Sequence, residues 1–247
     1  MVPCYNEEKR LDVQSFREFV AQPSGAALLF VDDGSRDHTM QVLERVRSGL
    51  ESRVEILRCE SNRGKAEAVR SGMSQLLEQG SWTYIGFWDA DLATPLDAVE
   101  DFIRILESRP DIEMVFGARV KLLGRDIQRR VTRHYLGRVF ATVVSNILRM
   151  PIYDTQCGAK LFRVGPDFVT AVRDPFLSKW VFDVEIIARY LRSYRSRGQR
   201  LEDRVYEFPL LRWADIAGAK VKPGDFLLAF KDTFKIWRKY LSRRRHG

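Results

Sequence analysis

Tyr84-Ile-Gly-Phe-Trp-Asp-Ala-Asp-Leu-Ala-Thr94 is the stretch of sequence that decides the fold. A short apolar run bounded by turn-forming residues predicts a buried strand. Alternate residues of a strand share a face, so Asp89 and Asp91 are expected to point to the same place. Carboxylates held together repel unless a cation compensates them, and oxygen ligands suit magnesium or manganese. The stretch therefore predicts a metal-diphosphate site. The alternative is a polar turn in which Asp91 or Thr94 caps a helix starting at Pro95.

Short apolar runs alternate with helix-period segments around this strand. The candidate strands are Ala26–Val31, Val54–Arg58, Tyr84–Trp88 and Glu113–Gly117, and the candidate helices are Leu11–Val20, Thr39–Leu50, Lys65–Leu77 and Leu96–Leu106. Such alternation predicts an α/β fold with a mostly parallel sheet and helices on both faces. Met1-Val2-Pro3 leaves room for only a short first strand, so we expect either a short strand or a natural chain that begins a few residues earlier.

Polar residues follow four of these strands, at the edge where such sheets bind their ligands. They are Glu7, then Asp32 and Asp33, then Asn62 to Lys65, then Asp89 and Asp91. Asp32 or Asp33 offers a carboxylate to a base or a ribose hydroxyl, and Lys65 at a helix start suits a phosphate. Taken singly, these loops have structural alternatives, such as helix capping by Ser35, Asp37 or Thr39. Their convergence on one edge predicts a binding site.

These loops resemble the ordered motifs of family 2 glycosyltransferases. The motifs are Pro3-Cys-Tyr-Asn-Glu7, Val31-Asp-Asp-Gly-Ser-x-Asp-x-Thr39, Asn62-x-Gly-Lys65 and Asp89-Ala-Asp91. The resemblance implies a GT-A-type, Rossmann-like fold and a divalent metal, magnesium or manganese, held by Asp91 with help from Asp89. It also implies a nucleotide-sugar site formed by Pro3, Tyr5, Asn6, Glu7, Asp32, Asp33, Lys65 and Asp89.

The second half of the chain is similar to the polyprenyl-phosphate hexosyltransferases of that family, most of all to the branch that transfers glucose to dolichyl phosphate. The similarity rests on Tyr153-Asp-Thr-Gln-Cys-Gly-Ala-Lys-Leu-Phe162, Trp180-Val-Phe-Asp-Val-Glu185 and Arg212-Trp-Ala-Asp-Ile-Ala-Gly-Ala-Lys-Val221. It implies an acceptor phosphate held by Arg119, Arg133 and Lys160. It also implies Asp154 as base or acceptor-orienting residue, with Asp183 and Glu185 behind it. Leu92, Ala93 and Ala219 depart from the patterns of related enzymes and leave the sugar open.

Two segments carry most of the net charge of +8. Residues 119–149 contain eight basic residues and one acid, and residues 231–245 contain seven and one. Both also have apolar residues at helical spacing, so we predict basic amphipathic helices, the first over Arg125–Arg149, that contact an anionic membrane surface. The alternative is a pair of helices packed on the core with solvated charged faces. Nucleic-acid binding is not favoured, because these segments lack the interleaved aromatic residues of base-stacking surfaces.

The predicted organisation is one domain over residues 1–223, with a nucleotide-sugar half (about 1–118) and an acceptor half (about 119–223), followed by a basic amphipathic helix over 224–247. Three widely spaced cysteines fit neither a zinc site nor a disulfide framework and favour a reducing compartment. The predicted function is inverting transfer of a hexose, glucose from UDP-glucose, onto a polyprenyl phosphate at the cytosolic face of a membrane. The alternatives are a hydroxyl acceptor, a GDP-mannose donor, or a non-catalytic protein that binds nucleotide sugars.

Overall fold

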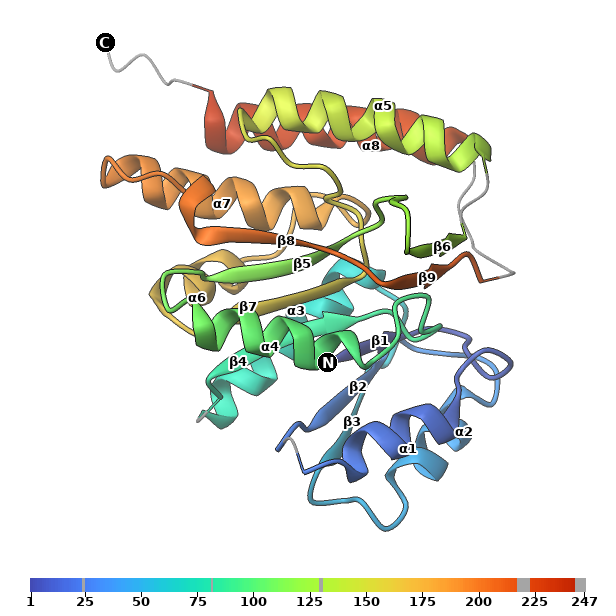
Figure 1. The fold of residues 1–247 in the computed structure, drawn as a ribbon. Coiled ribbons are helices and arrows are strands. Elements are labelled where there is room, and N and C mark those ends of the chain that lie inside the picture. Colours follow the sequence, from blue (N-terminus) through green and yellow to red (C-terminus); the bar gives the residue numbers. More distant parts are fainter. Residues whose placement is uncertain (24, 81, 129–130, 217–222, 243–247) are drawn as a thin grey trace.

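Two sheets placed side by side form the centre of the molecule (Figure 1). The computed structural model describes the chain except residues 24, 81, 129–130, 217–222 and 243–247, and except the side chains of 131–134 and 223–226. The first sheet has the order β1-β2-β3 and the second the order β4-β7-β5-β8. Their strands are β1 (Val2–Cys4), β2 (Leu28–Asp32), β3 (Val54–Arg58), β4 (Tyr84–Trp88), β5 (Met114–Ala118), β7 (Ala159–Arg163) and β8 (Val205–Pro209).

The two sheets are joined through Met1. Its amino group donates to Gly86 O at 2.7 Å, and its carbonyl accepts from Trp88 N at 3.1 Å. The pairs β1–β2, β2–β3 and β5–β8 are parallel, whereas β7 is antiparallel to both β4 and β5. The predicted α/β class with a mostly parallel sheet is confirmed.

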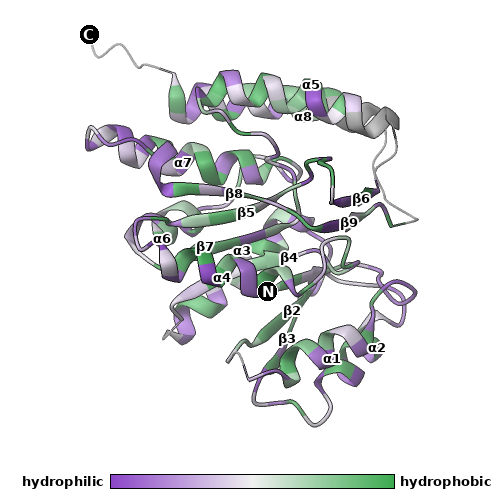
Figure 2. Ribbon diagram, in the orientation of Figure 1, coloured by the Kyte–Doolittle hydropathy of each residue, from purple (hydrophilic) through white to green (hydrophobic). Residues whose placement is uncertain are grey.

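Helices cover both faces of the sheets because alternate strand residues point to opposite sides. Leu29 and Val31 of β2 belong to a core shared with α3, α5, α6, α7 and α8, whereas Leu28 and Phe30 belong to a core shared with α1, α2 and α4. Figure 2 shows hydrophobic residues along the central strands and mixed colours on the helices. The helices are α1 (Val13–Ala21), α2 (Thr39–Arg47), α3 (Lys65–Gln79), α4 (Ala98–Ser108), α5 (Val131–Leu148), α6 (Pro166–Arg173), α7 (Phe182–Ser196) and α8 (Pro223–Ile236), with a 3-10 turn η1 (Glu202–Arg204) and a π-helical turn η2 (Trp237–Leu241) after α8.

The predicted helix over 125–149 is wrong at its start. Residues Asp126–Gln128 form strand β6, which pairs in parallel with β9 (Arg212–Ala214), and α5 begins only at Val131. Pairing with a strand more than eighty positions away overrides the local helical periodicity, a tertiary effect that the local pattern does not contain. A helix start at Pro95 is also wrong, since α4 begins at Ala98.

Helices α5 and α8 lie side by side as an outer layer (Figure 1). The rings of Phe140 on α5 and Phe230 on α8 are 5.4 Å apart, and Ala229 and Ile236 are buried in the same core as Phe140. The C-terminal segment is thus packed on the rest of the chain along one face. The predicted division of the chain into a domain over residues 1–223 and a separate helix over 224–247 stays a prediction. Among the helices that the structure describes, none has the length and hydrophobicity needed to cross a bilayer.

Gly86, in the middle of β4, provides a stability prediction. A Cβ atom there would lie 2.3 Å from the backbone oxygen of Lys160 on the neighbouring strand β7. Backbone atoms of a central strand cannot move aside cheaply, so we expect Gly86→Ala to lower the free energy of unfolding by about 3 kcal/mol. Urea denaturation followed by circular dichroism measures this change. A change below about 0.5 kcal/mol, typical of a neutral surface substitution, would contradict the packing described.

Candidate functional site

The loops that follow β1 and β2 are tied together by hydrogen bonds. Asn6 N donates to Ser35 Oγ at 3.0 Å, and Arg36 N donates to Asn6 Oδ1 at 2.9 Å. Glu7 N donates to Thr39 Oγ1 at 2.7 Å. Asn6 has a positive φ of 52°, a conformation that asparagine tolerates better than most residues. Asn6 and Glu7, both predicted to bind the nucleotide sugar, are therefore held at the carboxyl edge of the first sheet.

Asp32 and Asp33 end strand β2 with buried carboxylates. Asp33 accepts from Arg63 N at 2.9 Å and from Gly64 N at 2.8 Å, so both of its oxygens hold the loop that leads into α3. Asp32 accepts from Ser35 N at 3.2 Å. Gly34 lies between these loops with φ of 68°, and a Cβ there would come within 2.7 Å of Asn62 N. Asp33 therefore stabilises the loop before α3. Contacts of Asp32 and Asp33 with a nucleotide stay a prediction.

Lys65 and the two acids after β4 form the centre of the site. Lys65 Nζ lies 2.5 Å from Asp89 Oδ1, and Asp91 Oδ1 accepts from Ala93 N at 3.1 Å. Partial burial would lower the pKa of Lys65, but Asp89, Asp183 and Asp91 raise it overall. Burial, with Asp89 beside it, raises the pKa of the Asp91 carboxyl. Asp91 is therefore an acid whose negative charge is incompletely compensated.

These residues fit a divalent cation. Hard carboxylate oxygens suit magnesium or manganese, which usually keep waters and share phosphate oxygens of the substrate. Among the described residues, no cluster of three or more His, Cys, Asp or Glu side chains forms a metal site by itself. Asp91 and Asp89 would therefore hold the ion together with water and a diphosphate, and the ion would supply positive charge to a departing diphosphate.

One pocket, with a volume of about 280 Å³, joins these acids to the second half of the chain. On its polar side it is lined by Lys65, Asp89, Asp91, Arg119, Arg138, Tyr153, Asp154, Gln156, Lys179, Asp183 and Asp215. On its apolar side it is lined by Phe140 and Ala141 of α5, Ala229 of α8, and Trp180, Phe182 and Trp213. Of the predicted site residues, Lys65, Asp89, Asp91, Arg119, Asp154 and Asp183 therefore line one cavity beside α5 and α8, whereas Pro3, Tyr5, Asn6, Glu7, Asp32 and Asp33 are not among its described lining residues.

Asp154 is bound on both oxygens by Arg119. Arg119 Nε lies 2.6 Å from Asp154 Oδ2, and Arg119 Nη2 lies 2.7 Å from Asp154 Oδ1. Burial alone would lower the pKa of Arg119, but Asp154 raises it overall. The guanidinium also stacks over the Trp213 ring, with its carbon 5.2 Å from the ring centroid. The pair fixes the direction of Arg119 in the pocket.

Lys160 and Asp183 form a second buried pair. Lys160 Nζ lies 2.6 Å from Asp183 Oδ1 and donates to Cys157 O at 2.5 Å. Burial raises the pKa of Asp183, although Lys160 opposes the shift. Asp183 is among the described residues that line the pocket, and Lys160 is not. The Lys160 ammonium group is thus paired with the Asp183 carboxylate. The predicted contact of Lys160 with an acceptor phosphate stays a prediction.

The remaining predicted residues are placed as follows. Pro3 lies in β1 opposite Val31, and the Tyr5 side chain is half-buried just after it. The Arg133 side chain lies outside the described residues. Glu185 accepts from Leu177 N at 2.7 Å, from Arg189 at 2.7 Å and from the Tyr240 hydroxyl at 2.9 Å, so it ties α7 to η2.

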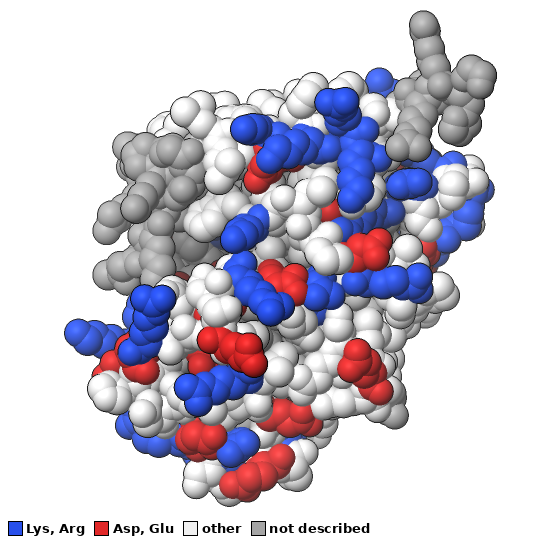
Figure 3. All heavy atoms as spheres, turned by 180° about the vertical axis from the view of Figure 1, so that it is seen from behind, with Lys and Arg blue, Asp and Glu red and all other residues white. Residues whose placement is uncertain are grey.

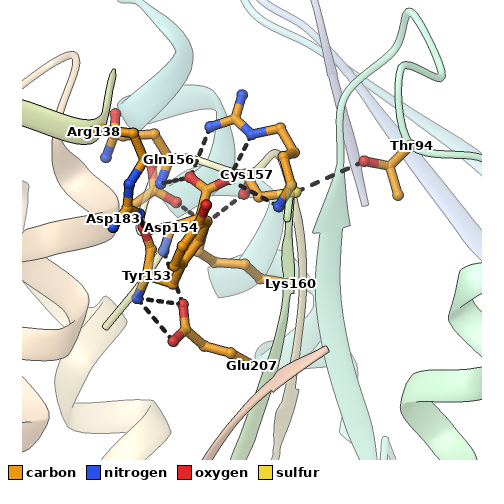
Figure 4. A network of polar contacts seen from close by, with 10 residues as sticks. Thr94, Arg138, Tyr153, Asp154, Gln156, Cys157, Lys160, Asp183 and Glu207 are labelled. Carbon is orange, nitrogen blue, oxygen red and sulfur yellow. Dashed lines mark hydrogen bonds and ion pairs between the residues drawn. The ribbon is translucent and has the colours of Figure 1, made fainter. Parts of the chain in front are cut away.

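The sequence interpretation did not single out Glu207, the half-buried acid of β8. Glu207 accepts from Tyr153 N at 2.9 and 2.8 Å with its two oxygens, and from Asp154 N at 2.9 Å (Figure 4). Burial raises the pKa of Glu207 in spite of these donors. A single acid inside the otherwise apolar stretch Val205-Tyr-Glu-Phe-Pro209 is the signal that could have drawn attention to it. Glu207 holds the turn that presents Asp154.

This contact predicts a loss of stability on truncation. Glu207→Ala leaves the N–H groups of Tyr153 and Asp154 without their acceptor, and we expect it to cost about 3 kcal/mol of unfolding free energy. Glu207→Gln keeps one acceptor oxygen and should cost less than half as much. Denaturant titration of both variants measures the difference. Equal stability of wild type and the alanine variant would contradict the assigned contact.

The edge of the sheet thus opens into a pocket that lysine, arginine and aspartate side chains line beside an apolar wall. Residues 1–168 match the family described as "Glycosyl transferase family 2". The chain therefore belongs to the family 2 glycosyltransferases, and it is a glycosyltransferase.

Curated relatives match nearly the whole chain and share one name. A protein of Dictyostelium discoideum named dolichyl-phosphate beta-glucosyltransferase is 31% identical, with 98% of this chain and 74% of the relative covered. Its namesake in Drosophila melanogaster is 33% identical, with the same coverage of both chains.

Solved structures show the same fold at low sequence identity. Glucosyl-3-phosphoglycerate synthase from Mycobacterium tuberculosis, in complex with Mn²⁺, UDP-glucose and phosphoglyceric acid, aligns with a TM-score of 0.65 at 16% identity, over 96% of this chain and 78% of that one. TarS from S. aureus, in complex with UDP, aligns with a TM-score of 0.60 at 16% identity, over 100% of this chain and 67% of that one.

Proposed function

We propose that this glycosyltransferase moves glucose from UDP-glucose, with inversion, onto dolichyl phosphate or a similar polyprenyl phosphate. The observation that carries the proposal is that Lys65, Asp89, Asp91, Arg119 and Asp154 line the same pocket beside an apolar wall. An acceptor with an anionic head and an apolar tail matches the two kinds of lining. The shared name of the curated relatives supports the same acceptor and sugar.

On the donor side, the proposal assigns the diphosphate to the edge formed by Lys65, Asp89 and Asp91. Lys65 provides a positive charge, and the two acids hold a divalent cation, magnesium or manganese. The fold neighbour solved with Mn²⁺ and UDP-glucose supports both the ion and the donor. Asp32 and Asp33, with Pro3, Tyr5, Asn6 and Glu7, surround the nucleoside in this arrangement.

On the acceptor side, the bonding of Asp154 favours a phosphate over a hydroxyl group. Both oxygens of Asp154 are engaged by Arg119, which makes the carboxylate a poor proton acceptor. A phosphate monoester has a second pKa near ~6 and is largely dianionic at neutral pH, so it needs no strong base to attack the anomeric carbon. Asp154 then orients Arg119 rather than removing a proton.

The outer layer of the molecule suits contact with the cytosolic face of an anionic membrane. Exposed apolar side chains are Tyr135, Leu136 and Val139 on α5 and Leu227, Leu228 and Phe234 on α8. Lys231, Lys235 and Arg238 are exposed on α8 and η2 among them. Seen from behind, lysine and arginine side chains gather in the upper half of the molecule, whereas the lower half mixes both signs (Figure 3). Apolar side chains flanked by cations are the pattern of an interfacial surface.

The activity is tested by incubating the protein with radiolabelled UDP-glucose or GDP-mannose and a polyprenyl phosphate, with and without Mg²⁺ or Mn²⁺. We expect metal-dependent label from UDP-glucose in the organic extract. Label from GDP-mannose alone would overturn the donor. If the protein binds a donor but neither donor gives labelled lipid, the proposed acceptor is wrong, and a hydroxyl compound is favoured as the acceptor.

The membrane contact is tested separately by flotation with vesicles of phosphatidylcholine, with and without phosphatidylserine. We expect binding to the anionic vesicles and its loss in the double variant Leu227→Ser, Leu228→Ser, with turnover of a water-soluble short prenyl phosphate unchanged. Equal flotation of the variant and wild type would exclude this face as the membrane contact.

A further inference from the structure

The positive charges that line the pocket are not equally available to a ligand. Lys65 is paired with Asp89, and Arg119 is paired on both nitrogens with Asp154. Across the part of the chain that the structure describes, no carboxylate lies within ion-pair distance of the other two lining cations, Arg138 and Lys179. Neither of these two cations is therefore neutralised by an ion pair among the described residues, and each can bind an anion.

Arg138 is held in place by neutral groups. Its Nη1 donates to Tyr153 O at 2.9 Å, and its guanidinium carbon lies 3.7 Å from the centroid of the Tyr153 ring (Figure 4). The pKa of Glu207 responds to the charge of Arg138, but the Glu207 oxygens accept from Tyr153 N and Asp154 N. A guanidinium has five N–H donors, so most donors of Arg138 stay open after the bond to Tyr153.

The two cations come from different segments of the pocket lining. The Lys179 side chain approaches Gly64 in the loop before α3, close to the donor residues. Arg138 is on α5, two residues before Phe140, which belongs with Ala141 to the apolar wall. An anion bound at Arg138 therefore has its apolar tail, if it carries one, against α5 and Ala229 of α8.

We propose that Arg138 is a binding residue for the phosphate of the prenyl acceptor, and that it sets the acceptor's affinity, while Arg119 is committed to Asp154. The proposal rests on the proposed function and adds a residue to it. A planar guanidinium packed on a ring offers two parallel N–H donors to phosphate oxygens, an arrangement that a lysine cannot reproduce.

The test compares Arg138→Gln and Arg138→Lys with wild type, using UDP-glucose and citronellyl phosphate, a soluble short prenyl phosphate. Arg149→Gln, at the exposed residue that follows the C-terminal end of the same helix, is the control. We expect the KM for citronellyl phosphate to rise by about 10- to 100-fold in Arg138→Gln, because a charge-assisted contact is lost. It should rise less in Arg138→Lys, and the KM for UDP-glucose should stay the same in all variants. An acceptor KM within twofold of wild type in Arg138→Gln overturns the proposal.

Calorimetric binding of citronellyl phosphate without donor separates this inference from the function on which it rests. If wild type transfers glucose to no prenyl phosphate but binds citronellyl phosphate, and Arg138→Gln does not, the assigned function fails and the anion site stands. If wild type and Arg138→Gln bind it equally, or neither binds it, the anion site is overturned. Arg138→Lys, which keeps the charge and the aliphatic stem, serves the same comparison if the glutamine variant does not fold.

Discussion

Replacing Asp91 with asparagine is expected to lower kcat/KM for UDP-glucose by about 10³-fold, or about 4 kcal/mol of transition-state stabilisation. Asparagine keeps the size of the side chain and the acceptor for Ala93 N, but it removes the negative charge that a divalent cation needs. Burial and the nearby Asp89 raise the pKa of Asp91, so its carboxylate charge is one that a bound cation would stabilise. Steady-state kinetics across a range of Mn²⁺ concentrations measure the effect, which excess metal should partly reverse.

Asp97→Asn is the matched control for this substitution. Asp97 is exposed at the far end of the same loop, where it pairs with Arg212 rather than facing the pocket. We expect it to change kcat/KM by less than about twofold, as surface substitutions usually do.

Asp154→Asn should lower kcat/KM less than Asp91→Asn does, because it loosens Arg119 without removing a metal ligand. The reverse order would favour a hydroxyl acceptor and a general base.

Gly158→Ala is expected to abolish most of the activity while leaving the fold intact. A Cβ at this position would lie 1.8 Å from Asp89 Oδ2, closer than any contact between such atoms. Because the obstructed atom is the end of a side chain, the carboxylate can turn away, and the 2.5 Å pair with Lys65 is then broken. We expect a loss of about 10²-fold or more in kcat, the scale of a one-ångström misplacement in an active site. Kinetics and thermal unfolding of the same preparation measure both parts.

Gly165→Ala controls for the loss of a glycine as such. Gly165 has no atom within 4 Å of the position of an added Cβ, and it lies seven residues further along, before α6. It should keep near wild-type kinetics. If Gly158→Ala were as active as this control, Asp89 would not need its observed position, and the assigned site would be wrong.

The strands that lie near each other in sequence could be predicted from local pattern alone. Val54–Arg58 and Tyr84–Trp88 have the predicted bounds, and α3 begins at Lys65 as expected. Each of these signals sits within a few residues: an apolar run, a turn, a change of period. The convergence of Asp33, Lys65 and Asp89 on one edge follows from the parallel connection, which the alternation of strands and helices implies.

The pairing of distant segments could not be predicted in this way. Strand β7 inserts between β4 and β5 in the opposite direction, and β6 pairs with β9. The same limit applies to the site. From the sequence, Asp154 is a candidate for a general base. Its two hydrogen bonds from Arg119, thirty-five positions away, show instead that it forms an ion pair. Arg138 is one of the eight basic residues of the segment 119–149, and the sequence does not show which of them lacks an acidic partner among the described residues, because that depends on the tertiary structure.

The wall that α8 contributes has a consequence for the protein during its synthesis. Ala229 lines the pocket, and the Tyr240 hydroxyl holds η2 to Glu185 on α7, so the acceptor side is complete only when residue 240 has left the ribosome. Translation at ~5–20 residues per second separates this moment from the emergence of β5 by on the order of 10 s. During that interval the nascent chain carries a donor edge without an enclosed acceptor pocket. Any transfer that needs the enclosed pocket therefore waits until α8 and η2 have emerged and packed against α7.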